Sequence, residues 1–193
     1  GWTRTAPGVV AIGPYRHTLA ERAMAAALSA SPAWASHATA ALLWGWEVRH
    51  GRIELTMGRD RGVKRADVRI HSTARLSVDD VGTVRGVPVT SPARTLLDLA
   101  GRTPVAALGA SLDDALARRL VTLETLASII PNQGGARWNR PSQLAELVRQ
   151  RQEVGTVESP LEARVLRVLM ASGLPLPVCQ YEVVIGGRRY RLD

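Results

Sequence analysis

Three helix-start signals constrain this fold most, because each fixes where a helix begins. Thr18–Glu21 has the spacing of a capping box, in which the hydroxyl and the carboxylate each accept from a free backbone N–H. Ser91 and Pro92 combine an N-cap residue with a proline at the first helical position. Ser159–Glu162 combines both signals. Helices therefore recur along the whole chain.

Alternating patterns between these signals predict strands. Residues 53–57 and 68–70 alternate apolar with polar side chains, which is typical of half-buried strands, and residues 87–89 favour another strand. Helices are expected over 18–29, 36–44, 91–99, 104–120, 122–130 and 141–152. This mixture predicts an α+β fold, with a central domain of helices and a small sheet.

Both ends of the chain carry hairpin patterns. Residues 1–13 hold the turn dipeptide Pro7-Gly8 between strand formers. In YEVVIGGRRYRLD (181–193), a two-residue turn at the paired glycines predicts the pairs Tyr181 with Leu192, Val183 with Tyr190 and Glu182 with Arg191. Apolar residues then meet apolar ones and opposite charges meet, so this register is self-consistent.

The charge balance favours a polyanionic partner. The chain has 25 Lys and Arg against 17 Asp and Glu, a net charge of +8, which favours nucleic acid first and an anionic membrane surface second. Only Lys64 is a lysine, a bias that GC-rich coding also produces. No apolar run reaches the roughly 18 residues of a membrane span, so no membrane-spanning helix is expected. Of the two candidate partners we expect nucleic acid and no membrane. A single cysteine, Cys179, excludes an intrachain disulfide and favours a cytoplasmic location.

A basic loop is the first candidate binding element. Arg59, Arg61, Lys64 and Arg65 lie between the strands at 53–57 and 68–70, where we expect the tip of a hairpin. Such a tip would contact the phosphates of DNA, and the release of counterions would make binding depend on salt. The alternative is a solvated loop that only keeps the protein soluble.

The histidines and tryptophans are more typical of structural roles. No pair of histidines has the spacing of a zinc helix, and His37 near a helix start favours a cap or core contact. Trp44 and Trp46 flank a glycine at a helix end and favour core packing. Neither a Gly-x-Ser-x-Gly elbow nor a phosphate-binding Gly-x4-Gly-Lys-Ser/Thr motif is present.

Two carboxylates are candidate catalytic residues. A nuclease that uses Mg²⁺ needs two or three carboxylates at the metal, and Glu162 on a helix with Asp193 after a hairpin would suit that chemistry. Asp193 would then be the metal ligand. In the alternative interpretation, Glu162 serves only the capping box and Asp193 is an ordinary polar strand residue.

Two motifs resemble a known family. SHATAALLWGW (36–46) and VPVTSPARTLLDLA (87–100), in this order, resemble the central domain of actinobacterial proteins similar to AbiEi-type antitoxins of type IV toxin–antitoxin systems. The resemblance implies an N-terminal winged helix-turn-helix that binds DNA. Residues 1–13 resemble the wing of that module, which would place Arg4 on the wing, with the recognition helix expected before residue 1.

The last part of the chain resembles a second family. Residues 158–193 are similar to the start of a nuclease-like domain related to very-short-patch-repair endonucleases, a branch of the PD-(D/E)XK fold. The resemblance implies that Glu162 matches the helix glutamate and that Asp193 matches the first metal-binding aspartate. A further Glu-x-Asp or Glu-x-Lys strand would follow beyond the sequence, so this form is expected to be inactive.

These interpretations give one domain plan and three functional hypotheses. We expect a wing remnant at 1–13, an antitoxin domain at 14–154 and the first helix and hairpin of a restriction-endonuclease-like fold at 155–193. The first hypothesis is a cytoplasmic DNA-binding regulator or antitoxin that binds double-stranded operator DNA and neutralises a cognate toxin. The alternatives are a Mg²⁺-dependent DNA endonuclease and a protein-interaction module that touches no nucleic acid.

Overall fold

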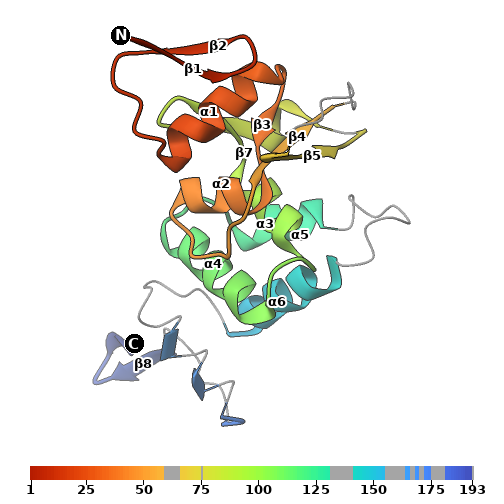
Figure 1. Cartoon of the computed structure of the whole chain (residues 1–193). Helices are drawn as coiled ribbons and strands as arrows, with labels where there is room; N and C mark the ends of the chain where they lie inside the picture. The colour runs from red at the N-terminus through yellow and green to blue at the C-terminus, as the bar shows by residue number, and fades with distance from the viewer. Residues whose placement is uncertain are drawn as a thin grey trace. The chain divides into compact units, whose positions relative to one another are not determined.

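The computed structural model describes residues 1–58, 66–74, 76–130, 141–154, 164–165, 168–169, 172–174 and 181–192. Within these residues the fold is α+β, with six α-helices, a five-stranded mixed sheet and two small hairpins (Figure 1), which confirms the predicted class. The chain forms two compact units, Gly1–Ala107 and Leu108–Asp193. No helix in the described ranges is long and apolar enough to cross a membrane.

The elements follow one another from a hairpin at the N-terminus to a hairpin at the C-terminus. The strands are β1 (Trp2–Ala6), β2 (Val9–Ile12), β3 (Trp34–Ala35), β4 (Ile53–Met57), β5 (Val68–Ser72), β6 (Val81–Val84), β7 (Val87–Thr90), β8 (Tyr181–Ile185) and β9 (Arg188–Leu192). The helices are α1 (Leu19–Ser29), α2 (His37–Trp44), α3 (Pro92–Leu99), α4 (Val105–Ala117), α5 (Leu123–Ile129) and α6 (Pro141–Val154), with a 3₁₀ turn η1 (Val78–Asp80).

The five-stranded sheet has the order β5-β4-β3-β7-β6. Its central strand, β3, has two residues, and Ala35 pairs antiparallel with Leu55 on one side and parallel with Val89 on the other. Two residues are too few to show an alternating pattern, so the sequence did not predict this strand. β6 was not predicted either, although it forms an antiparallel hairpin with the predicted β7.

The expected hairpin between β4 and β5 is wrong. The two strands pair in parallel, from Ile53 opposite Val68 to Met57 opposite Ser72. The connection, residues 58–67, is long enough to return along a five-residue strand, since extended chain spans about 3.3 Å per residue. Arg59, Arg61, Lys64 and Arg65 fall in this connection and lie outside the described residues.

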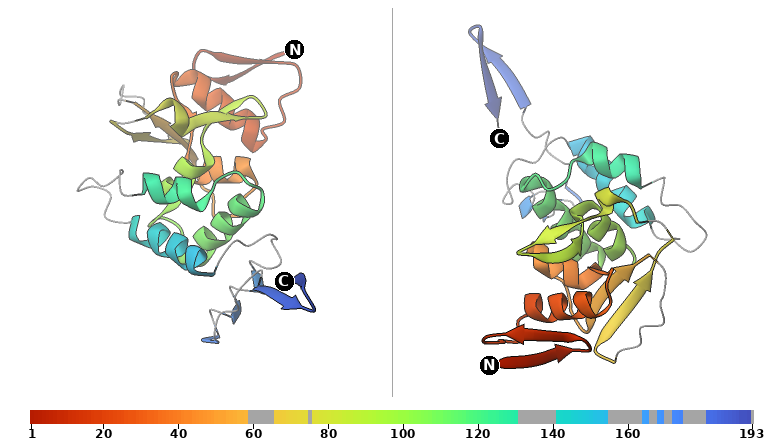
Figure 2. Two further views of the ribbon diagram at one scale, coloured as in Figure 1. Left: turned by 180° about the vertical axis from the view of Figure 1, so that it is seen from behind. Right: turned by 90° about the horizontal axis from the view of Figure 1, so that it is seen from above.

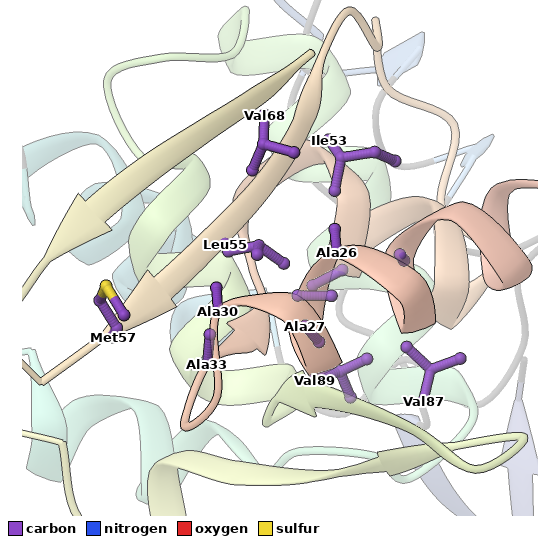
Figure 3. Close-up of a cluster of buried hydrophobic side chains, with 13 residues drawn as sticks. Ala26, Ala27, Ala30, Ala33, Ile53, Leu55, Met57, Val68, Val87 and Val89 are labelled. Atoms are coloured by element: carbon purple, nitrogen blue, oxygen red, sulfur yellow. The ribbon is translucent and has the colours of Figure 1, made fainter. Parts of the chain in front are cut away.

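The core of the first unit packs one face of α1 onto the sheet. Figure 3 shows Ala26, Ala27 and Ala30 directed toward the side chains of the strands. Leu55 and Val89 are fully buried opposite them. Small alanine side chains let the helix backbone approach the sheet closely, and the larger strand residues supply most of the buried apolar area.

The N-terminal residues form the predicted hairpin. β1 and β2 pair antiparallel around Pro7-Gly8, where Gly8 adopts φ 73°. The hairpin lies against α1, as both views of Figure 2 show. Arg4 is exposed on β1 and pairs with Val10.

Two of the three helix-start signals lie in described residues, and both are confirmed. Thr18 and Glu21 form a complete capping box at α1. The Ser91 hydroxyl accepts from the backbone N–H of Arg94 at the start of α3, with Pro92 in the first turn. The third signal, Ser159–Glu162, lies outside the described residues.

The second unit contains the predicted helices α5 and α6 and most of the predicted helix α4. The first three residues of α4, from Val105, belong to the first unit. A buried ion pair joins two of them: Arg151 Nε on α6 donates to Asp113 Oδ1 on α4 at 3.0 Å. The β8–β9 hairpin pairs Tyr181 with Leu192, Glu182 with Arg191 and Val183 with Tyr190, as the sequence predicted.

Candidate functional site

Strand alternation gives the first unit a second, polar side. On β4, Glu54 lies between Ile53 and Leu55, which are both in the core cluster with α1. Successive side chains of a strand point to opposite faces, so Glu54 is directed away from that cluster. The parallel register places Arg69 of β5 opposite Glu54, and His71 follows two residues later on the same face. One polar face of the sheet edge is thus built from two strands.

Glu54 holds the start of α2. Its Oε2 accepts from the backbone N–H of Ala38 at 3.0 Å, and its own backbone N–H donates to the hydroxyl of Thr39 at 2.9 Å. The N-cap residue Ser36 makes no side-chain capping bond. A carboxylate from a neighbouring strand therefore supplies the acceptor that a helix N-terminus needs.

Two stacked histidines adjoin Glu54. The rings of His37 and His71 lie 3.7 Å apart at 18°. His71 Nε2 donates to Glu54 Oε1 at 3.2 Å. Burial raises the pKa of Glu54, but the hydrogen bonds from His71 and the Ala38 N–H outweigh it, and the pKa falls to about 2. Glu54 is therefore ionised at neutral pH.

His37 is a buried, neutral residue. Burial, with the charges of His71 and nearby arginines, lowers the pKa of His37 to about 3. Its Nδ1 lies 3.0 Å from the hydroxyl of Ser36, and its backbone has φ 52°, which non-glycine residues rarely adopt. The expected structural role of His37 is confirmed, because it packs in the interior at the first position of α2.

Asp98 on α3 is the second carboxylate of this cluster, and its side chain is fully buried. Arg94 Nε donates to Asp98 Oδ1 at 2.9 Å, one helical turn away. The other oxygen, Oδ2, has no hydrogen-bond partner among the described residues, and the Nδ1 atom of the neutral His37 ring lies 3.9 Å from it. Burial raises the pKa of Asp98 to about 6, although the charge and hydrogen bond of Arg94 oppose the rise.

These groups line a pocket of about 460 Å³. Its wall includes Glu54, Asp98 and His37, which come from a strand and two helices. Four arginines complete the charged wall: Arg49, Arg52, Arg69 and Arg102. Four guanidinium groups thus face two carboxylates, and the wall carries net positive charge.

The arginines differ in their partners. Arg69 Nη1 lies 3.9 Å from Glu54 Oε1 and is loosely paired. Within the part of the chain that the structure describes, Arg49, Arg52 and Arg102 have neither an ion-pair nor a hydrogen-bond partner for their guanidinium groups, and all three are exposed. A concave site with unpaired guanidinium groups attracts anions, and phosphates above all.

The structure does not bring the predicted site residues together. Arg4 lies on the N-terminal hairpin and is not part of the pocket wall. The predicted loop residues Arg59, Arg61, Lys64 and Arg65, and the predicted catalytic residues Glu162 and Asp193, lie outside the described residues. In the described ranges, no group of three or more His, Cys, Asp or Glu side chains is arranged to hold a metal.

Sequence reasoning missed the pocket, although two signals pointed to it. Arg94 and Asp98 form a charged pair with helical spacing inside an otherwise apolar segment, which favours a buried pair. Glu54 interrupts the apolar residues of a buried strand. Arg94 and Asp98 lie within the second motif, whereas Glu54 lies eight residues after the first. The two motifs meet in space, because Trp44 Nε1 donates to the carbonyl of Thr90 at 3.1 Å.

Comparison with known protein families gives a match to most of the chain. The family model of the AbiEi antitoxin C-terminal domain matches residues 25–147, a range that includes both motifs and every residue of the pocket wall. Neither a curated protein nor a solved structure matches the chain. Because this single model covers more than half of the sequence, the chain belongs to the AbiEi antitoxin C-terminal domain family.

Proposed function

We propose that the protein is the antitoxin of a type IV toxin–antitoxin system and neutralises a cognate toxin. The observation that carries this proposal is the family match over residues 25–147, since it covers all residues of the core cluster of the first unit except Ala23. The contact between Trp44 and Thr90 joins the two motifs into one packed structure, which is what a shared domain architecture requires. We also keep the cytoplasmic location as a prediction.

Gene deletion in the source organism tests the antitoxin role. We expect that the gene for this protein can be deleted only after the neighbouring toxin gene has been deleted, because a toxin without its antitoxin stops growth. The matched control is deletion in a strain that carries the antitoxin gene on a plasmid. Free recovery of the single deletion, with unchanged growth and an intact toxin gene, contradicts the proposal.

Binding to operator DNA is the second part of the proposed function. The net charge of +8 supports it, and Arg4 is exposed on the N-terminal hairpin. We assign the phosphate contacts to Arg4 and to the loop residues Arg59, Arg61, Lys64 and Arg65. Such contacts make the logarithm of the affinity fall linearly with the logarithm of salt concentration.

A gel-shift salt series tests the DNA contacts. Replacing Arg59, Arg61, Lys64 and Arg65 by alanine is expected to weaken binding to duplex DNA and to reduce the salt slope by about 1 for each lost phosphate contact. Arg118→Ala is the control, because Arg118 is exposed and already pairs with Asp114. The assignment is ruled out if the affinity for DNA does not change with salt concentration. It is also ruled out if Arg118→Ala weakens binding as much as the replacement of the four loop residues.

A second candidate function is a Mg²⁺-dependent endonuclease of the PD-(D/E)XK class. This proposal rests on the resemblance of residues 158–193 to such nuclease domains, and the β8–β9 hairpin that precedes Asp193 has the register predicted from its two-residue turn. In this proposal Asp193 holds the metal, Glu162 supports it and water is the nucleophile. The full-length protein should nick DNA with Mg²⁺, and Asp193→Ala should abolish nicking. Equal nicking by that variant refutes the assignment.

A further inference from the structure

The pocket in the first unit holds more positive charge than its own carboxylates neutralise. Glu54 is already engaged by the Ala38 N–H and by His71. Asp98 is engaged through one oxygen by Arg94. Neither carboxylate lies within ion-pair distance of Arg49, Arg52 or Arg102 in the described part of the chain. Unpaired guanidinium groups that share a concave wall repel one another, and an anion bound between them would remove that repulsion.

The buried part of the pocket wall, at Asp98, requires a hydrogen-bond donor and not an anion. Asp98 lines the pocket with a side chain that is 0% exposed, so it belongs to the buried part of the wall, whereas Arg49, Arg52 and Arg102 are exposed. Its Oδ2 atom is an acceptor without a donor among the described residues. A buried acceptor without a partner is unfavourable, and a ligand that donates a hydrogen bond there would relieve it. An ionised phosphate alone does not supply this donor and would meet a carboxylate.

A ligand that satisfies both ends has phosphate groups at one end and hydroxyl or amino donors at the other. The size agrees, because about 460 Å³ lies in the range of small-molecule sites and is much more than one phosphate fills. We propose that this pocket binds a nucleotide, with its phosphates on Arg49, Arg52 and Arg102 and a hydroxyl or amino group at Asp98. This site goes beyond the antitoxin function and does not depend on it.

Calorimetric titration of the protein with ATP, GTP, CTP and UTP tests the site. At least one nucleotide is expected to bind, and Arg49→Ala and Arg102→Ala should each weaken its affinity tenfold or more. Both residues are exposed, so the variants should keep the thermal unfolding profile of the parent protein. Arg118→Ala is the matched control, because it removes the same charge from the turn after α4, outside the pocket wall, and should change the affinity less than twofold.

Three results would overturn the proposal. The first is that none of the four nucleotides gives a heat of binding at a concentration of about 1 mM, which is the upper end of the usual range for cellular ligands. The second is nucleotide binding that Arg118→Ala weakens as much as the pocket variants, since that shows attraction by net charge alone. The third is pyrophosphate binding as tightly as the best nucleotide, because then no group at Asp98 contributes.

A competition experiment distinguishes a free nucleotide from the terminal nucleotide of a nucleic-acid chain as the natural ligand. A short single-stranded oligonucleotide with a 5′-phosphate should displace the nucleotide if the natural ligand is the end of a nucleic-acid chain, while the same oligonucleotide without that phosphate should not. If neither displaces it, the ligand is a free nucleotide. Displacement by both oligonucleotides alike contradicts a site built for a terminal nucleotide.

Discussion

The two carboxylates of the pocket, the part-buried Glu54 and the fully buried Asp98, have pKa values that are shifted in opposite directions. Glu54 accepts three hydrogen-bond or charge contacts from Ala38, His71 and Arg69, so its ionised form is favoured. Asp98 has a single guanidinium partner and one oxygen without a donor in the described residues, so burial prevails and its neutral form is favoured at mildly acidic pH. The balance of donors against burial decides each pKa.

The pH dependence of stability tests these opposite shifts. The raised pKa of Asp98 means that its contribution falls as pH rises from about 4 to about 6, whereas the lowered pKa of His37 means that its contribution rises with pH from about 3 to 6.5. The two effects oppose each other between pH 4 and 6. In Asp98→Asn, of these two effects only the rise from His37 remains, with a slope of up to about 1.4 kcal/mol per pH unit.

Urea denaturation of the parent protein and Asp98→Asn at pH 4, 5 and 6 measures this effect. The free energy of unfolding should climb more steeply with pH in the variant, even if the variant is less stable throughout. Parallel pH profiles for the two proteins would show that Asp98 titrates normally in the folded state.

At the scale of elements, local signals predicted what local interactions determine. The capping residues Thr18 and Ser91 bond within one turn of their own helices, and the β8–β9 register follows from a two-residue turn. The sequence did not predict strand pairings that depend on residues far apart along the chain. β3 exists because Ala35 lies between Leu55 and Val89, and no pattern in two residues shows that. The parallel pairing of β4 with β5 likewise depends on the whole sheet.

The end of α2 offers a test of one local signal. Gly45 adopts φ 91° at the C-cap, as expected from its position after the predicted helix. Gly45→Ala should lower the free energy of unfolding by about 1 kcal/mol, because a Cβ disfavours this conformation. Gly82→Ala is the control: no atom lies within 4 Å of its added Cβ, its φ is not positive, and its stability should stay within about 0.5 kcal/mol. Equal effects of the two changes in urea denaturation would contradict this account of the helix end.

The ion pair between α4 and α6 offers a test of packing in the second unit. Asp113→Ala leaves Arg151 buried without its carboxylate, and the free energy of unfolding should fall by about 3 kcal/mol or more. Asp114→Ala removes the neighbouring carboxylate, whose pair with Arg118 is exposed, and should cost less than about 1 kcal/mol. Chemical denaturation of both variants checks the difference. A similar small loss for both would mean that the buried pair adds no more than a surface pair.

At the scale of the whole molecule, the sequence predicted the family and the fold class but not the pocket. The two motifs, 36–46 and 87–100, carry the family resemblance and lie within the matched range. The pocket arginines are spread from Arg49 to Arg102 and fall in no single motif. Only the packing of β4, β5, α2 and α3 brings them to one wall. The spacing of residues in the sequence does not predict that these arginines lie close together.

The central claim, that this chain acts as an antitoxin, is tested most directly by expressing it together with the toxin encoded beside its gene. The measurement is the number of colonies that toxin-expressing bacteria form with the protein and with an empty vector. The account predicts that colonies return to the level of cells without toxin, whereas an unrelated toxin still kills. Continued killing by the neighbouring toxin, while the protein is present and folded in the same cells, would contradict it.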